Sequence, residues 1–251
     1  MKAIILAAGK GSRLDPGSGE TVKCLLKLGE VTLLERTITY LRTSGIERIA
    51  VVVGFQAERV RQTGGPQIEY IENQNYAKTN SMYSLWLARH LFGEGFIVLN
   101  SDVLFHPQLL ADLLASPHED AILISYRNST QYGEEEMKVK VRERRLLDIS
   151  KTMDPKEADG ENVGIVKFGK TGAALLTEEM EALVARGELR SWVPRAFLEF
   201  TKKRTLHVID TRGLPWTEID FPEDYRRAQQ EILPQIPAIV PLQSVVSDDE
   251  C

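Results

Sequence analysis

Apolar positions along the first part of the chain follow two different spacings. Residues 3–6, 49–53 and 96–99 are continuous apolar runs, which are typical of strands buried on both faces of a parallel sheet. Between these runs, apolar residues recur every three to four positions over 33–41, and again after a candidate helix cap at Asn80 or Ser81. Strands that alternate with helices predict a mostly parallel, doubly wound sheet. We therefore expect a three-layer α/β/α, Rossmann-like fold.

The pattern changes in the second half of the chain, where short strands follow one another without a long helix between the first two. The elements predicted there are strands over 137–141, 146–149, 163–168 and 206–209 and helices over 173–186 and 193–202. This succession indicates a small mixed-sheet insertion, approximately residues 126–205, layered on the first sheet. A last helix opens near Pro222, so we expect one domain over residues 1–232. Further prolines argue against a helix beyond it, and residues 233–251 are expected to form a flexible, proline-containing tail.

Composition excludes several classes of protein. The 251 residues carry a formal net charge of -5, which gives no long-range attraction to nucleic acid, so no nucleic-acid partner is expected. Cys24 and Cys251 are the only cysteines, which is not a disulfide framework, and we expect a cytoplasmic protein. The apolar run at the start is too short for a signal peptide, and no run approaches the roughly 20 residues that span a membrane.

A glycine-rich loop directly after the first strand is the strongest chemical signal. Residues 6–14 read Leu-Ala-Ala-Gly-Lys-Gly-Ser-Arg-Leu, and Lys23 follows. Small residues let the backbone approach a nucleotide, and successive N–H groups can cradle phosphate oxygens. Arg13 and Lys23 add positive charge where a departing pyrophosphate would gather negative charge. The dinucleotide-binding fingerprint and the P-loop pattern both fail here, and a plain strand-to-helix turn is the alternative.

Three acids form the second signal. Asp102 follows the strand over 96–99, at the carboxyl edge of the sheet, where ligands of open α/β folds bind. Glu218 and Asp220 share one face of an extended segment. Together they would supply the all-oxygen ligand set that Mg²⁺ takes. The alternative is a solvated strand edge in which Asp220 caps the last helix.

These residues carry a resemblance to a known family. Residues 7–13 with Lys23 match the opening motif of the nucleotidyltransferase superfamily that activates sugar phosphates and phospho-alcohols. Asp102 and Asp220 fall at the family's two metal-binding aspartates, Lys151 resembles the lysine that grips the acceptor phosphate, and residues 162–165 resemble its Asn-Ala-Gly-Ile segment. The resemblance covers roughly residues 1–230.

Within that superfamily the chain is most similar to phosphocholine and 2-aminoethylphosphonate cytidylyltransferases, on the evidence of residues 75–76, 79–85 and 218–220. Two positions depart from the pattern. Val22 stands where the family usually has proline before the loop lysine, and Ile219 stands where phosphocholine enzymes tend to have an aromatic residue.

The resemblance implies a Mg²⁺-dependent transfer of a nucleoside monophosphate, CMP from CTP, to a small phosphorylated or phosphonate acceptor with release of pyrophosphate. The expected catalytic residues are Arg13, Lys23, Asp102 and Asp220, and the expected Mg²⁺ ligands are Asp102, Glu218 and Asp220. The expected nucleotide contacts are Leu6, Ala7, Ala8, Gly9, Gly11, Ser12, Arg13, Lys23, Asn80, Ser81 and Asp102. The expected acceptor contacts are Glu134, Lys151, Glu161 and Trp216. The sequence leaves a homodimer open.

For an amine-bearing acceptor, Trp192 and Trp216 offer ring faces and residues 134–136 offer negative charge. The alternative is that both tryptophans pack between the two sheets.

Three other functions compete with this interpretation. The first is an enzyme of the same superfamily that joins a hexose 1-phosphate to UTP or GTP. The second is a P-loop NTPase, because residues 164–171 match the written P-loop pattern and Asp210 could serve as its magnesium partner; the bulky inner residues nevertheless favour a strand. The third is a non-catalytic nucleotide-binding regulator, which would not need Arg13, Lys23, Asp102 and Asp220 together.

Overall fold

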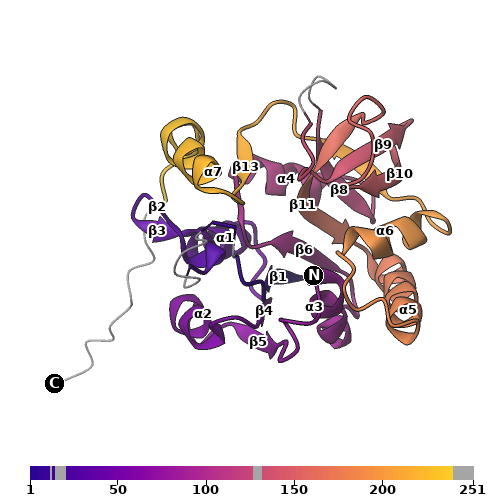
Figure 1. The fold of residues 1–251 in the computed structure, drawn as a ribbon, viewed down its shortest axis with the longest axis horizontal. Coiled ribbons are helices and arrows are strands. Elements are labelled where there is room, and N and C mark those ends of the chain that lie inside the picture. Colours follow the sequence, from indigo (N-terminus) through magenta and orange to yellow (C-terminus); the bar gives the residue numbers. More distant parts are fainter. Residues whose placement is uncertain (12, 15–20, 127–131, 240–251) are drawn as a thin grey trace.

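The computed structural model describes residues 1–11, 13–14, 21–126 and 132–239. A nine-stranded sheet in the order β5-β4-β1-β6-β11-β8-β12-β10-β9 runs through the molecule (Figure 1). Its first four strands are parallel neighbours, and their bounds are β1 (Lys2–Ala7), β4 (Ile49–Val53), β5 (Glu69–Glu72) and β6 (Phe96–Asn100). These strands confirm the parallel half of the prediction.

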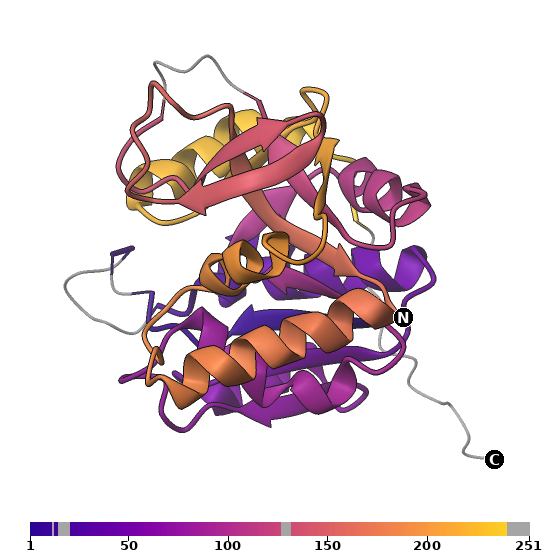
Figure 2. The same cartoon turned by 90° about the vertical axis from the view of Figure 1, so that its right-hand side faces the viewer.

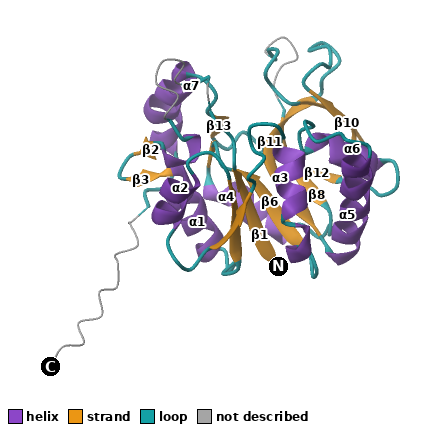
Figure 3. Ribbon diagram, turned by 60° about the horizontal axis from the view of Figure 1, so that its bottom comes forward, coloured by secondary structure: helices purple, strands orange, loops and turns teal. Residues whose placement is uncertain are grey.

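Helices cover both faces of this sheet, because successive side chains of a strand point to opposite sides. Ala3, Ile5 and Ala7 of β1 face a core shared with α1 (Leu33–Thr43) and α4 (Pro107–Ala115). Ile4 and Leu6 face a second core, which three further helices supply. These helices are α3 (Ser81–Leu87), α5 (Lys170–Ala185) and α6 (Pro194–Thr201). The strands run between helices on either side (Figure 3), and α5 and α6 lie next to each other across one face (Figure 2). The expected three-layer α/β/α fold is confirmed.

The strands of the second half continue the same sheet, and the expectation of a separate layered sheet is corrected. The long strand β11 (Gly160–Phe168) pairs antiparallel with β6 through its second half and with β9 through its first residues. The other strands there are β8 (Ala121–Ser125), β9 (Lys138–Arg142), β10 (Arg145–Ser150) and β12 (His207–Asp210). Since β9 pairs with both β10 and β11, this end of the sheet curls back on itself.

Several short elements lie outside the nine-stranded sheet. The 3-10 turn η1 (Lys23–Leu25) follows the glycine-rich loop, and β2 (Lys27–Leu28) and β3 (Val31–Thr32) lead into α1. The two-stranded ladder of β7 (Val103–Phe105) and β13 (Trp216–Glu218) is antiparallel. The remaining helical segments are α2 (Ala57–Gly64), η2 (Arg89–Leu91), α7 (Pro222–Arg227), η4 (Ala228–Ile232) and η5 (Leu233–Gln235). Among the described helices none is long and apolar enough to cross a bilayer.

The expected flexible tail begins later than predicted. Leu233–Gln235 forms the 3-10 turn η5, with Pro234 in its first turn, where its missing N–H costs nothing. Ile236 is only 6% exposed and belongs to the same core as α1. The prediction is therefore wrong for 233–236, and residues 240–251 lie outside the described part of the chain.

Candidate active site

A cavity of about 470 Å³ opens at the carboxyl edge of β1 and β6, the edge at which the sequence placed its chemistry. The predicted nucleotide contacts that line it are Leu6, Ala7, Ala8, Gly9, Gly11, Arg13, Lys23, Asn80, Ser81 and Asp102. Ser12, the remaining one, lies outside the described residues. The cavity therefore gathers residues that are far apart in the sequence.

Close backbone packing shapes the floor of this cavity. The carbonyl of Ala8 accepts a hydrogen bond from the N–H of Phe55 at 3.1 Å. A Cβ at Gly54 would lie 2.7 Å from the Cβ of Tyr76 and 2.8 Å from the Ala8 carbonyl oxygen, so only glycine lets β4 pass this close to the loop. Gly11 has a φ of 60°, in the left-handed region, and its carbonyl accepts from the N–H of Leu14 at 3.1 Å. The glycine-rich segment is thus a tight turn held against the end of the sheet.

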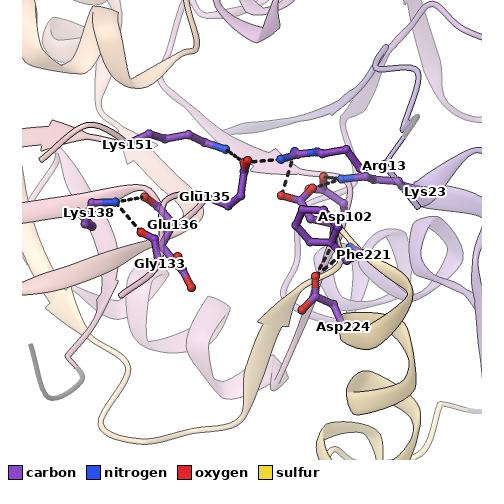
Figure 4. Close-up of polar contacts among 11 residues, drawn as sticks. Arg13, Lys23, Asp102, Gly133, Glu135, Glu136, Lys138, Lys151, Phe221 and Asp224 are labelled. Carbon is purple, nitrogen blue, oxygen red and sulfur yellow. Dashed lines mark hydrogen bonds and ion pairs between the residues drawn. The ribbon is translucent and has the colours of Figure 1, made fainter. Parts of the chain in front are cut away.

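Lys23 lines the cavity and lies beside Arg13, where its side chain points to the neighbouring acids (Figure 4). Its neighbours Val22 and Cys24 are buried in the core, which fixes the backbone, and its side chain is 12% exposed. The ammonium donates to Asp102 Oδ2 at 3.2 Å and to Asp220 Oδ1. Burial alone would lower the pKa of Lys23, but Asp102 and Asp220 outweigh it and the pKa is raised, so the side chain stays charged.

Arg13 reaches the same acids from the other side of the loop. Its guanidinium donates to Asp220 Oδ2 at 3.0 Å and to Glu135, and it lies 5.4 Å from the centre of the Phe221 ring. Lys23 and Arg13 therefore share Asp220, and the predicted pair of cations is brought together at one end of the cavity.

The three predicted metal ligands converge. Asp102, Glu218 and Asp220 each offer a carboxylate oxygen, and these atoms lie within 4.8 Å of one another. Glu218 is held opposite Val103 by the β7–β13 ladder, and the Ile219 N–H donates to the Asp102 carbonyl at 2.9 Å. Burial, and then the charges of Asp102 and Asp220, raise the pKa of Glu218 to about 8.

The alternative role of Asp220 as a helix cap is not observed. The N-cap of α7 is Phe221, and the carboxylate of Asp224 accepts from the backbone N–H groups of Asp220 and Phe221 at 3.1 and 2.9 Å. The Asp220 side chain is left to face Lys23 and Arg13. Its carboxylate is therefore available to the cavity.

This donor set fits Mg²⁺. The three ligand atoms are carboxylate oxygens that lie within 4.8 Å of one another, and oxygens are the donors that Mg²⁺ prefers.

The opposite wall of the cavity belongs to α3 and the turn before it. Asn80 caps α3, its side-chain oxygen accepting from the Ser81 N–H at 2.8 Å. The buried Asn73 donates to the hydroxyls of Thr79 and Ser84, both at 3.0 Å, and so fixes the turn. Sequence reasoning assigned no role to several lining residues, namely Asn73, Tyr76, Thr79, Ser84 and Asn100. The family-like segment 75–85 was the one signal that pointed to this wall.

Of the four residues predicted to contact the acceptor, Lys151 lines the cavity and the other three do not. Lys151 lines the cavity, donates to Glu135 Oε2 at 3.0 Å, and lies 5.3 Å from the Trp192 ring centre. Trp192, 49% exposed, also lines the cavity. Glu135 rather than Glu134 makes the ion pairs, with Arg13 and Lys151, which line the cavity; both glutamates are exposed.

Two predicted acceptor contacts do not reach the cavity. Trp216 is 7% exposed and packs in the core with α1 and α4, because its place on β13 is opposite Phe105. Glu161 is buried within β11, in register with Lys138 of β9. The prediction that these two residues contact the acceptor is corrected, and for Trp216 the packing alternative holds.

The competing P-loop interpretation is wrong. Residues 164–168 are buried positions of β11, not a loop. Lys170 begins α5, and its ammonium pairs with Glu94 at 2.8 Å on the surface. Backbone N–H groups that are committed to strand pairing cannot wrap a phosphate.

Comparison with known proteins agrees with this geometry. The model of the MobA-like NTP transferase domain matches residues 3–206. A CMP-5'-(3-aminopropyl)phosphonate synthase from Streptomyces rubellomurinus is 33% identical over 130 residues, 50% of this chain and 21% of that protein. A choline-phosphate cytidylyltransferase from Streptococcus pneumoniae is 33% identical over 121 residues, 47% of this chain and 52% of that protein.

Solved structures show the same fold. A CTP:phosphocholine cytidylyltransferase from Streptococcus pneumoniae superposes with a TM-score of 0.74 at 24% identity, covering 91% of this chain and 97% of that one. The inositol-1-phosphate CTP transferase from T. maritima gives the same score and identity, covering 94% of this chain and 98% of that one.

This chain spans about half of the length of most of these curated relatives, or less. A bifunctional IPC transferase and DIPP synthase from Rubrobacter xylanophilus is 29% identical over 237 residues, which are 92% of this chain and 52% of that protein. The match to the family model spans most of the chain and includes the glycine-rich loop, Lys23 and Asp102. The chain belongs to the family of MobA-like NTP transferase domains.

Proposed function

We propose that the protein is a Mg²⁺-dependent cytidylyltransferase that transfers CMP from CTP to a small phosphate or phosphonate acceptor bearing an amine, such as phosphocholine or 2-aminoethylphosphonate. One observation carries the proposal. Arg13, Lys23 and three clustered carboxylates stand at one end of a single cavity, and Lys151 lines the same cavity. A pair of cations and a further lysine around one cavity suit a reaction that joins two phosphorylated molecules.

The reaction is an in-line displacement. An oxygen of the acceptor attacks the α-phosphorus, a new P–O bond forms, and the bond to the bridging oxygen breaks to release pyrophosphate. The acceptor is already an anion, so no general base is required, and the catalytic contribution lies in positioning and charge stabilisation.

Each group has a part in that displacement. Arg13 and Lys23 stabilise the negative charge that gathers on the departing pyrophosphate. Lys151 holds the acceptor phosphate for attack. Asp102, Glu218 and Asp220 would hold Mg²⁺, which when bound neutralises phosphate charge. The wall formed by residues 73–84 would contact the nucleotide, as the resemblance implies for Asn80 and Ser81, with Asn80 at the ribose or base.

The acceptor end supports an amine-bearing substrate. Trp192 offers an exposed ring face, and Glu135 offers a carboxylate beside Lys151. Trp192, Lys151 and Glu135 all fall within residues 126–205, which we propose as the acceptor-binding part. The names of two relatives, an aminopropylphosphonate synthase and a choline-phosphate cytidylyltransferase, agree with such an acceptor.

A pyrophosphate-release assay tests the proposal. The protein is incubated with CTP, UTP, GTP or ATP, with Mg²⁺ or EDTA, and with phosphocholine, 2-aminoethylphosphonate, inositol 1-phosphate or glucose 1-phosphate. We expect release with CTP, Mg²⁺ and an amine-bearing acceptor. A preference for glucose 1-phosphate with UTP or GTP would establish the sugar-phosphate alternative, and the absence of acceptor-dependent release with every pair would overturn the proposal.

A further inference from the structure

One carboxylate, that of Glu135, links the two cationic sides of the cavity. Its Oε2 accepts from the Lys151 ammonium at 3.0 Å and also from the Arg13 guanidinium (Figure 4). The side chains of Glu135, Lys151 and Arg13 are 48%, 19% and 40% exposed. Glu135 therefore lies between the group proposed to bind pyrophosphate and the group proposed to bind the acceptor phosphate.

A buried lysine fixes the turn that carries Glu135. Lys138 is 1% exposed, and its ammonium donates to the Gly133 carbonyl at 2.8 Å and to the Glu136 carbonyl at 3.3 Å. These carbonyls flank Glu134 and Glu135 along the chain. Lys138 of β9 thus fixes the backbone on both sides of Glu135. The Glu135 carboxylate therefore has a defined position, unlike the acids of a freely solvated turn.

We propose that Glu135 selects an acceptor that carries an ammonium group as well as its phosphate or phosphonate. When such an acceptor binds, the ion pair between Glu135 and Lys151 is replaced by two ion pairs with the acceptor. The acceptor's phosphate takes the Lys151 ammonium, and its ammonium takes the Glu135 carboxylate. Lys138 is the positioning residue that holds Glu135 for this exchange. The inference rests on the proposed function and assigns the specificity to this residue.

Electrostatics favour a zwitterion at this ion pair. Ion pairs that are this exposed contribute little, so the Lys151–Glu135 pair opens easily. A zwitterionic acceptor then satisfies both separated charges. A purely anionic acceptor takes Lys151 from Glu135, which then keeps its contact with Arg13. It also brings its negative charge close to the Glu135 carboxylate, and like charges in contact are unfavourable. The hydrogen bond from Lys151, and further that from Arg13, lower the pKa of Glu135, so the carboxylate is charged at neutral pH.

The test compares each acceptor with its uncharged isostere. Phosphocholine is paired with 3,3-dimethylbutyl phosphate, and 2-aminoethylphosphonate with propylphosphonate. We expect the wild-type protein to favour the charged member, and Glu135→Gln to raise its KM by about 10-fold, equivalent to about 1.4 kcal/mol, with the KM for CTP unchanged. The KM for the isostere should stay the same or fall. Glu134→Gln is the matched control and should leave all of these values unchanged.

Lys138→Met supplies a second, independent measurement. Losing the two carbonyl contacts should release the turn and reduce the preference for the charged acceptor as Glu135→Gln does, while the KM for CTP stays the same. A general loss of structure would instead change the constants for CTP and for both acceptors together, and that result in a folded Lys138→Met protein would remove Lys138 from the proposal.

The outcomes separate this inference from the proposed function. If no pair of NTP and acceptor gives pyrophosphate, the proposed function fails. If the wild-type protein turns over but accepts charged and uncharged acceptors equally, the selection by Glu135 is overturned and the transferase activity stands. Equal improvement of both acceptors in Glu135→Gln would identify Glu135 as a plug that substrates displace, which also overturns the selection.

Discussion

A Cβ atom at Gly164 would lie 2.7 Å from the side-chain nitrogen of Asn100 and 2.9 Å from its Cγ. Gly164 also has a φ of 83°, which non-glycine residues rarely adopt. Its N–H donates to the side-chain oxygen of Asn162 at 3.0 Å. β11 therefore lies very close to Asn100, the last residue of β6. Asn100 lines the cavity and precedes Asp102 by two residues.

Replacing Gly164 tests this contact. We expect Gly164→Ala to lower the free energy of unfolding by about 1–3 kcal/mol, because the residue would keep a left-handed conformation that costs alanine this much. Displacement of Asn100 should also reduce turnover. Urea unfolding and pyrophosphate release measure the two effects. Gly93→Ala is the control, since a Cβ there meets nothing within 4 Å and φ is not positive. Wild-type stability in Gly164→Ala would show that the contact relaxes freely.

Loss of one carboxylate of the proposed Mg²⁺ site should remove activity without unfolding the protein. We expect Asp102→Asn and Asp220→Asn each to abolish Mg²⁺-dependent turnover, because the amide keeps the shape but loses the charge that holds the cation. Each side chain faces the cavity and Lys23, so circular dichroism should show a folded protein. Activity is measured at limiting Mg²⁺. Near-normal turnover in either variant would remove that residue from the metal site.

Lys23 and Lys170 distinguish the glycine-rich loop from the rejected P-loop. Lys23→Ala should reduce turnover by ~10²-fold or more, the scale for removing one charge-stabilising donor. Lys170→Ala should be nearly silent, since its ammonium pairs with Glu94 on the surface. Single-turnover rates at saturating CTP measure both. If Lys170 proved essential and Lys23 dispensable, the assignment of the site to the glycine-rich loop would be wrong.

The spacing of apolar residues correctly predicted strands whose burial depends mainly on their own sequence. Residues 3–6 and 49–53 are apolar runs, and they form β1 and β4 as expected. Glu218 and Asp220 share a face because alternation along an extended segment is a property of the backbone. The glycine-rich loop and its cations were predictable for the same reason, since the residue types and their order carry the chemistry.

Long-range pairing decided what the sequence could not. The curl of the sheet comes from β9 pairing with β11 as well as with β10, and β9 and β11 are too far apart in the chain for one short window to contain both. Trp192 and Trp216 look alike as aromatic residues, but pairing with β7 buries Trp216 while Trp192 stays exposed at the cavity. Glu135, one of the acids at 134–136, pairs with Arg13, which is 122 positions away in the chain, and with Lys151 on the far side of the β9–β10 hairpin.

The two tryptophans should therefore respond differently to substitution. Trp216→Leu removes part of a buried ring, so it should destabilise the protein by about 1–3 kcal/mol and disturb CTP and the acceptor alike. Trp192→Leu should leave stability within about 0.5 kcal/mol and raise the KM of the amine-bearing acceptor far more than that of CTP. Thermal unfolding and the two KM values decide between these roles. A selective acceptor effect in Trp216→Leu would restore Trp216 as an acceptor contact.

A stacked pair of histidines outside the cavity is expected to make the stability of the protein depend on pH. The rings of His118 and His207 lie 3.7 Å apart with planes 7° from parallel. Burial first, and then the neighbouring His118 and Arg145, lower the pKa of His207 from its ordinary value of 6.5. A second group acts in the opposite direction, because the raised pKa of Glu218 makes folding favour its protonated form. The total pH slope therefore mixes the two.

The variant His207→Gln isolates the histidine contribution. Because the folded-state pKa of His207 is lowered, the unfolded chain binds the proton first as pH falls below about 6.5, and stability is lost between that pH and the lower folded-state value. Wild-type protein should therefore lose more unfolding free energy than His207→Gln between pH 7.5 and 5.5, by at most about 1.36 kcal/mol for each tenfold difference in proton affinity between the unfolded and folded states. Urea unfolding at several pH values measures the difference, which cancels the contribution of Glu218. Parallel curves for wild type and His207→Gln would mean that the stacked pair does not couple protonation to folding.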